Sequence, residues 1–148
     1  MIEAFNEKER ELNQVKEEIL PVNKFPSRRG GSTFSLLPER DELILFGGEY
    51  YNGHKVTMFN DLYVYNLKKM QWTLIKAPNG PPPRTFHQAV CVSRNGGELW
   101  IFGGEFSSPS QSQFYHYNDL WVFNFQSKQW TKIQYKINIK ILRLLKIF

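Results

Sequence analysis

Residues 41–50 read Asp-Glu-Leu-Ile-Leu-Phe-Gly-Gly-Glu-Tyr, and residues 97–106 read Gly-Glu-Leu-Trp-Ile-Phe-Gly-Gly-Glu-Phe. The two stretches share an apolar run that ends in two glycines and a glutamate. Gly47 and Gly103, the first glycines of the two pairs, lie 56 positions apart. The chain of 148 residues therefore contains the same unit twice, which is typical of a protein built from repeats.

The repetition extends beyond the glycines. Residues 60–66 and 118–124 both begin with Asn-Asp-Leu and continue with aromatic and β-branched residues, which favour β-strands. Trp72 and Trp130 follow at matched places, 58 positions apart. A unit of about 50 residues that carries a double glycine is typical of one blade of a β-propeller.

Each copy contains four candidate strands. They are residues 32–37, 43–46, 62–66 and 72–75 in the first copy, and 86–93, 99–102, 120–124 and 130–133 in the second. Residues 76–83 between the copies are rich in proline, which lacks an N–H group and cannot join a central sheet. We therefore predict an all-β fold of two four-stranded antiparallel blades, an incomplete β-propeller, with repeats at residues 25–81 and 82–133.

Residues 1–24 predict a helical leader that ends at Pro21. Its apolar residues recur at three-, four- and seven-residue spacings: Ile2, Phe5, Leu12, Val15 and Ile19. We expect this stripe to rest on the first blade, and a coiled-coil partner site is the alternative. The predicted helix itself, residues 2–20, is shorter than three heptads and too short for an independent coiled coil.

Residues 134–148 leave the repeat pattern and form a basic, apolar tail. As a helix, this tail would be amphipathic and could lie on a membrane surface or enter a groove on a partner. The alternative is that it is translated non-coding sequence, because Ile, Lys, Leu and Asn replace the Pro/Gly turn expected before a further blade.

The net charge of +5 does not indicate a nucleic-acid-binding surface on the repeats. Residues 134–148 carry +4, residues 25–133 carry +3, and residues 1–24 carry −2. Most of the excess positive charge therefore lies in the tail, so we do not expect the repeats to bind nucleic acid.

The single cysteine, Cys91, excludes an internal disulfide. It lies in an apolar strand and is expected to be a buried small hydrophobe, in preference to a reactive thiol. Residues 1–20 are charged throughout, unlike a signal peptide, and no stretch approaches the roughly 18 apolar residues of a membrane span. We expect an intracellular protein, cytoplasmic or nuclear and not secreted.

These features resemble the kelch repeat, which combines a double glycine, an aromatic residue, six intervening residues, a tryptophan and an arginine before the first strand. In the first copy the arginine is Arg28 or Arg29. The remaining motif residues are Gly47, Gly48, Tyr65, Trp72, Arg84, Gly103, Gly104, Phe123 and Trp130. The resemblance covers residues 26–133 and implies propeller blades. Related proteins carry about six repeats, so it also implies a fragment of a longer propeller.

Residues 50–59 and 106–117, between the second and third strands, are long and rich in Gly, Asn, Ser, Tyr and His, a composition suited to surface contacts. Their candidate partner-binding residues are Tyr50, Tyr51, His54, Phe106, Phe114, Tyr115 and His116. We expect a non-catalytic module that binds an unidentified protein partner. The alternatives are a truncated or read-through product without stable independent function, self-association through open blade edges, and membrane attachment through the tail.

No enzymatic chemistry, metal or cofactor is expected. The three histidines His54, His87 and His116 lack ligand spacing, and no nucleophile-base pair or phosphate-binding loop is identifiable. Glu49 and Glu105 follow the double glycines at matched positions. They are expected to accept hydrogen bonds that fix the blade geometry, and a ring of carboxylates is the alternative.

Overall fold

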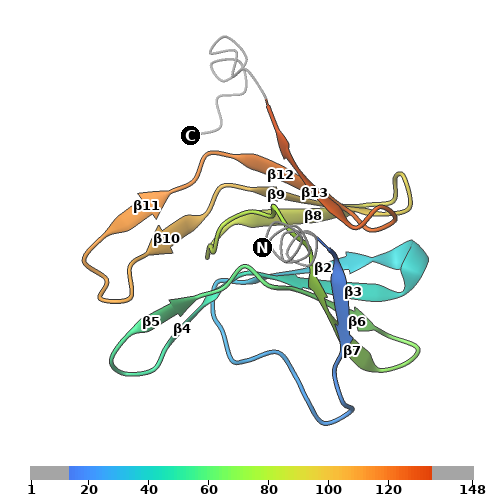
Figure 1. Ribbon diagram of the computed structural model, residues 1–148, viewed down its shortest axis with the longest axis horizontal. Coiled ribbons are helices and arrows are strands. Elements are labelled where there is room, and N and C mark those ends of the chain that lie inside the picture. Colours follow the sequence, from blue (N-terminus) through green and yellow to red (C-terminus); the bar gives the residue numbers. More distant parts are fainter. Residues whose placement is uncertain (1–13, 135–148) are drawn as a thin grey trace, which may run out of the picture.

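The computed structural model describes residues 14–134, which form two packed antiparallel sheets and two short ribbons (Figure 1). Blade 1 consists of β2 (Thr33–Leu37), β3 (Glu42–Phe46), β6 (Leu62–Asn66) and β7 (Gln71–Lys76), and blade 2 of β8 (Gln88–Val92), β9 (Glu98–Phe102), β12 (Leu120–Asn124) and β13 (Gln129–Ile133). Their orders are β7-β6-β3-β2 and β13-β12-β9-β8. A single 3-10 turn, η1 (Pro38–Arg40), connects β2 to β3.

The eight predicted strands are confirmed, with bounds that differ by at most two residues. Their registers match as well. Phe46 on β3 pairs with Leu62 on β6, and Phe102 on β9 pairs with Leu120 on β12. Because successive side chains of a strand point to opposite faces, this matched register places corresponding residues of the two copies on corresponding faces of their blades.

The prediction of a helix up to residue 20 is wrong over residues 16–19. These residues form β1 (Lys16–Ile19), which pairs antiparallel with β7 and adds a fifth strand to the outer edge of blade 1. The added strand satisfies N–H and C=O groups that a free sheet edge would leave unpaired, and this non-local pairing overrides the four-residue spacing of Val15 and Ile19. Residues 2–13 of the predicted helix lie outside the described residues.

Within residues 14–134 the structure contains no helix with the length and apolar character needed to cross a membrane. The predicted tail helix lies outside the described residues, except for Gln134, which follows β13 without secondary structure.

The core lies between the two blades. Its buried side chains are Leu37, Ile44, Phe46, Leu62, Val64 and Ile75 from blade 1, and Leu99, Ile101, Phe123 and Phe125 from blade 2. The Trp130 ring lies 5.4 Å from the ring of Phe46 and 5.0 Å from that of Phe123. Since burying one such side chain stabilises by about 1.5–3 kcal/mol, the packing of blade against blade is the main source of stability.

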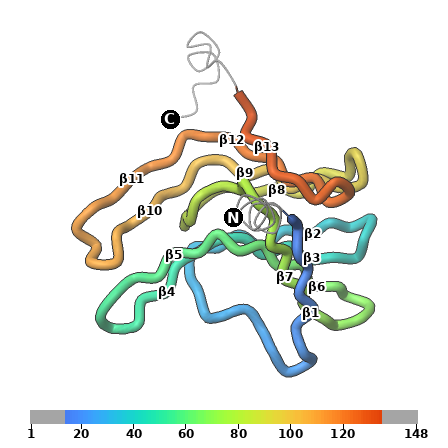
Figure 2. Tube along the Cα trace, viewed as in Figure 1, coloured from blue at the N-terminus to red at the C-terminus, as the bar shows by residue number. Residues whose placement is uncertain are grey.

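Two ribbons leave the same end of the blades (Figure 2). The first ribbon consists of β4 (Glu49–Tyr51) and β5 (Val56–Met58), and the second of β10 (Glu105–Ser107) and β11 (Phe114–His116). They occupy the segments in which the sequence predicted long loops. Each ribbon follows a double glycine and leads into the third strand of its blade.

Candidate partner-binding site

The double glycines turn the chain from each blade into its ribbon. All four have positive φ, from 63° at Gly47 to 101° at Gly48, and glycine adopts these angles without steric cost. At Gly104 there is also no room for a side chain, because an added Cβ would lie 2.7 Å from the carbonyl oxygen of Thr85. The residues after these glycines then pair with the segment before the first strand: Glu105 and Thr85 exchange two hydrogen bonds of 2.9 Å. Close backbone approach at this point explains the requirement for glycine.

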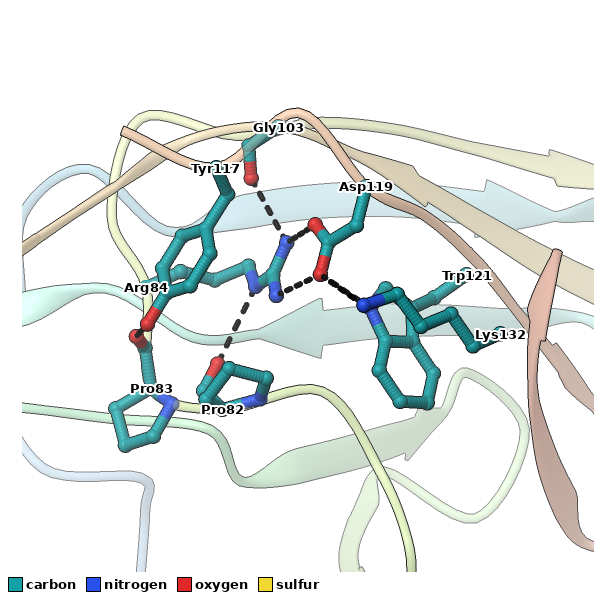
Figure 3. A network of polar contacts seen from close by, with 8 residues as sticks. All are labelled: Pro82, Pro83, Arg84, Gly103, Tyr117, Asp119, Trp121 and Lys132. Atoms are coloured by element: carbon teal, nitrogen blue, oxygen red, sulfur yellow. Dashed lines mark hydrogen bonds and ion pairs between the residues drawn. The ribbon is translucent and has the colours of Figure 1, made fainter. Parts of the chain in front are cut away.

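A buried arginine holds the base of the second ribbon (Figure 3). The guanidinium of Arg84 is fully buried, and its Nη1 donates to the carbonyl oxygen of Gly103 at 2.9 Å and to Asp119 Oδ1 at 2.7 Å. Its Nη2 donates to Asp119 Oδ2 at 3.2 Å, and its Nε donates to the carbonyl oxygen of Pro82 at 3.2 Å. The ring of Tyr117 covers it at 4.1 Å. Arg84 therefore joins the residue that enters the ribbon, Gly103, to the residues that leave it.

The carboxylate of Asp119 stays ionised in this setting. Burial alone would raise its pKa, but hydrogen bonds from Arg84 and from Trp121 Nε1, the latter at 2.7 Å, outweigh burial and lower the pKa below its ordinary value. Lys132 adds a further positive charge, with its Nζ 3.8 Å from Oδ2. The base of the ribbon is thus a charge-paired cluster that remains ionised through the neutral range.

The first ribbon has the same kind of base. Arg29 forms an ion pair with Asp61, with Nη2 3.1 Å from Oδ2, and donates to the carbonyl oxygen of Gly47 at 3.1 Å. Its guanidinium lies 4.0 Å from the centre of the Phe59 ring. Of the two candidate arginines in the first copy, Arg29 thus occupies the place that Arg84 has in the second.

The sequence analysis did not identify Asp61 and Asp119 as partners of the two arginines. The available signal was their recurrence, since both copies place an arginine before the first strand and an Asn-Asp-Leu before the third. The aromatic pair of the motif also repeats in space. Tyr65 and Trp72 rings lie 4.9 Å apart in blade 1, and the corresponding rings in blade 2 lie 5.0 Å apart.

The ribbons present exposed aromatic side chains. Among the predicted partner-binding residues, Tyr50, Tyr51, His54, Phe114, Tyr115 and His116 are exposed and Phe106 is partly buried. The structure separates them into two groups, because β5 and β10 are the neighbouring strands and β4 and β11 lie on the outer sides. The two tyrosines of β4 therefore do not join the aromatic residues of β11.

A pocket of about 320 Å³ lies between the ribbons. Its lining combines one predicted residue, Phe106, with seven that sequence reasoning missed: Lys55, Val56, Thr57, Met58, Pro83, Ser107 and Pro109. The ribbons meet here through a 3.0 Å hydrogen bond from the N–H of Val56 to the carbonyl oxygen of Pro109. The pocket is lined largely by apolar atoms, and it depends on the relative position of the two blades.

Comparison with known proteins identifies this architecture. Residues 5–143 match the family model described as the KLHDC2/KLHL20/DRC7 Kelch-repeats domain. The chain belongs to the kelch-repeat family. Two curated relatives are similar to part of this chain: the flagellar outer arm dynein alpha chain of Chlamydomonas reinhardtii is 35% identical over 109 residues, and the Rho GTPase-activating protein gacHH of Dictyostelium discoideum is 36% identical over 92.

The kelch chain spans a small part of these relatives. The matches cover 72% and 61% of this chain but only 2% of the dynein and 6% of the GTPase-activating protein. Among solved structures, YjhT has a TM-score of 0.50 at 18% identity, with 73% of this chain and 38% of that chain covered, and so supports the kelch fold alone. A narrower resemblance, to the N-terminal part of kelch domain-containing protein 4, stays a prediction.

Proposed function

We propose that this chain is a non-catalytic protein-interaction module whose two ribbons bind a protein partner. The observation that supports the proposal is the largely apolar pocket between the ribbons, in which Phe106 and Met58 lie side by side in the lining. Buried aromatic anchors contribute most to protein interfaces, and a pocket of about 320 Å³ accommodates one such side chain. Kelch repeats serve protein interaction in general, and we place the interaction inside the cell.

The bases of the ribbons support this function physically. Arg29 and Arg84 each join the two ends of a ribbon through buried or partly buried hydrogen bonds, so the ribbons are held at defined positions before a partner arrives. Pre-organised loops lose less conformational entropy on binding. We infer that the partner inserts an apolar side chain between the ribbons, beside Met58 and Phe106.

A comparison of two surface variants tests this proposal. The ribbon variant replaces Met58 and Phe106 by serine, and the control variant replaces Leu67 and Met70, two exposed residues of the turn between β6 and β7, by serine. Affinity capture with quantitative mass spectrometry should show partners that the control retains and the ribbon variant loses, while both give the circular dichroism spectrum of the parent. Retention of every partner by the folded ribbon variant would contradict the proposal.

A further inference from the structure

Each blade has two faces, which we name by one residue on each. The tryptophan face carries Trp72 in blade 1 and Trp130 in blade 2, and the phenylalanine face carries Phe46 in blade 1 and Phe102 in blade 2. Cross-strand partners share a face. The tryptophan face thus contains the row Leu36, Leu43, Tyr65 and Trp72 in blade 1, and the row Cys91, Leu99, Phe123 and Trp130 in blade 2.

Within the chain, the tryptophan face of blade 2 packs on the phenylalanine face of blade 1. The Trp130 ring lies 5.4 Å from the Phe46 ring, and His87 contacts Phe46 edge-on at 5.3 Å. His87 Nε2 also hydrogen bonds to Thr33 Oγ1 at 2.8 Å. This interface is closely packed, since Phe46 and Leu37 are both 0% exposed.

The two remaining faces expose the corresponding apolar side chains. Phe102, which precedes the double glycine as Phe46 does, is 47% exposed, and Val92, which corresponds to Leu37, is 37% exposed. On the tryptophan face of blade 1, Phe34 and Leu36 are 57% and 51% exposed. A depression of about 240 Å³ on the phenylalanine face of blade 2 is lined by Gln88, Ala89, Val90, Trp100, Ile101, Phe102 and Leu120.

We propose that the 148-residue chain assembles with copies of itself, the tryptophan face of blade 1 in one copy packing on the phenylalanine face of blade 2 in the next. The occupant is a second copy because the two open faces are the two halves of an interface that the chain already makes once internally. Trp72 of one copy then lies against Phe102 of its neighbour, as Trp130 lies against Phe46 within the chain.

This contact is heterologous, because it joins two different surfaces, and successive copies therefore form a ring if the rotation closes. Propellers close with about four to eight blades, so two to four copies of this two-bladed chain complete a ring. The internal interface also brings β5 beside β10, so the equivalent packing between copies brings β11 of one copy beside β4 of the next. The pocket lined by Met58 and Phe106 lies between the two ribbons of one copy, and the assembly leaves it in place. The assembly is therefore independent of the partner binding proposed above.

Light scattering coupled to size exclusion tests the assembly with the full chain. The parent should elute as a discrete species of two to four times 17.5 kDa, the mass of one chain. Phe34→Asp and Phe102→Asp each place a charge on one open face, and each variant alone should be a monomer. Met70→Asp changes an exposed residue of the turn between β6 and β7 and should assemble like the parent.

Mixing the two face variants distinguishes this interface from other modes of association. Each variant retains one intact face, so an equimolar mixture of Phe34→Asp and Phe102→Asp should form a complex of about 35 kDa, twice the mass of one chain, and nothing larger. A parent that is a folded monomer at high concentration would overturn the proposal. So would a mixture that stays monomeric, or association that neither variant reduces.

Cross-linking gives a second measurement that does not rely on charged substitutions. Ser32 in blade 1 has the sequence position that His87 has in blade 2, and Gln88 in blade 2 has the position that Thr33 has in blade 1. His87 and Thr33 form the hydrogen-bonded pair of the internal interface. With a short bis-maleimide, the double variant Ser32→Cys/Gln88→Cys should form covalent multimers and each single variant should not. Cross-linking of either single variant to the same extent, or monomers only in the double variant, would overturn the proposed register.

Discussion

The interface between the two blades should weaken in mild acid because of one buried histidine. His87 is 3% exposed, and its ring lies between blade 1 and the ribbon base of blade 2. Burial lowers its pKa from 6.5 to about 4, and the nearby Arg84 guanidinium contributes to the shift. Protonating this imidazole would place a positive charge in an apolar interface beside another positive charge.

The sign and size of the effect follow from these two values. The folded state keeps His87 neutral down to about pH 4, whereas the unfolded chain takes up the proton near pH 6.5. The unfolded state therefore binds more protons between these values, and the free energy of unfolding falls as the pH falls through this window. The loss between pH 7 and pH 5 is about 2 kcal/mol for this one group.

Urea unfolding followed by tryptophan fluorescence at pH 7, 6 and 5 measures this loss at a fixed protein concentration, since self-assembly would also change stability. The variant His87→Gln should lose about 2 kcal/mol less than the parent over this range. His54→Gln changes an exposed histidine and should keep the pH dependence of the parent. If His87→Gln loses as much stability as the parent, protonation of the buried His87 is not the cause of the loss in acid.

Two substitutions and one labelling experiment test the packing of the ribbon bases and of the blade interface. Arg84→Met leaves the carboxylate of Asp119 without its guanidinium, so we expect a loss of about 3–5 kcal/mol in urea unfolding, and a loss below about 1 kcal/mol would contradict the role of the pair. Gly104→Ala should lower the free energy of unfolding clearly more than Gly53→Ala. Both glycines have positive φ, but only at Gly104 does a backbone oxygen lie 2.7 Å from the added Cβ. Equal losses of stability in the two variants would contradict the role of close backbone approach at Gly104. Burial raises the pKa of the Cys91 thiol from 9.0 to about 11. At pH 8 a thiol reagent should therefore label the folded protein about a hundredfold more slowly than the urea-unfolded protein. Equal labelling rates would show that the thiol is accessible in the folded protein.

The eight blade strands were predictable from sequence because each carries a strong local signal. An apolar run that ends in two glycines marks β3 and β9, and Asn-Asp-Leu marks β6 and β12. The ribbons were missed because their strands have three residues each, too few to show an alternation of apolar and polar residues. β1 was misassigned because its partner, β7, lies more than fifty residues away and nothing local indicates the pairing.

The candidate site was predictable only in its parts. The exposed aromatic residues of the ribbons follow from the composition of residues 50–59 and 106–117, but their grouping depends on which strands become neighbours. β5 and β10 meet because the blades pack face to face, so Met58 and Phe106 line one pocket while Tyr50 remains on an outer strand. Sequence reasoning could identify these side chains as surface residues, but the packing of the blades decides which of them act together.

One short segment connects the blade interface to the proposed binding site. The side chain of Arg84 holds the base of the second ribbon, and its backbone binds the two ends of the first ribbon. The carbonyl oxygen of Arg84 accepts a hydrogen bond from the N–H of Gly48 at 2.8 Å, and the N–H of Arg84 donates to the carbonyl oxygen of Phe59 at 3.0 Å. Three residues later, His87 of blade 2 forms a hydrogen bond to Thr33 of blade 1 and so connects the two blades. The pocket between the ribbons therefore keeps its shape only while the blades remain packed. Partner affinity should fall in the same acid range in which protonation of His87 destabilises the blade interface. His87→Gln should reduce the loss of stability and the loss of affinity together.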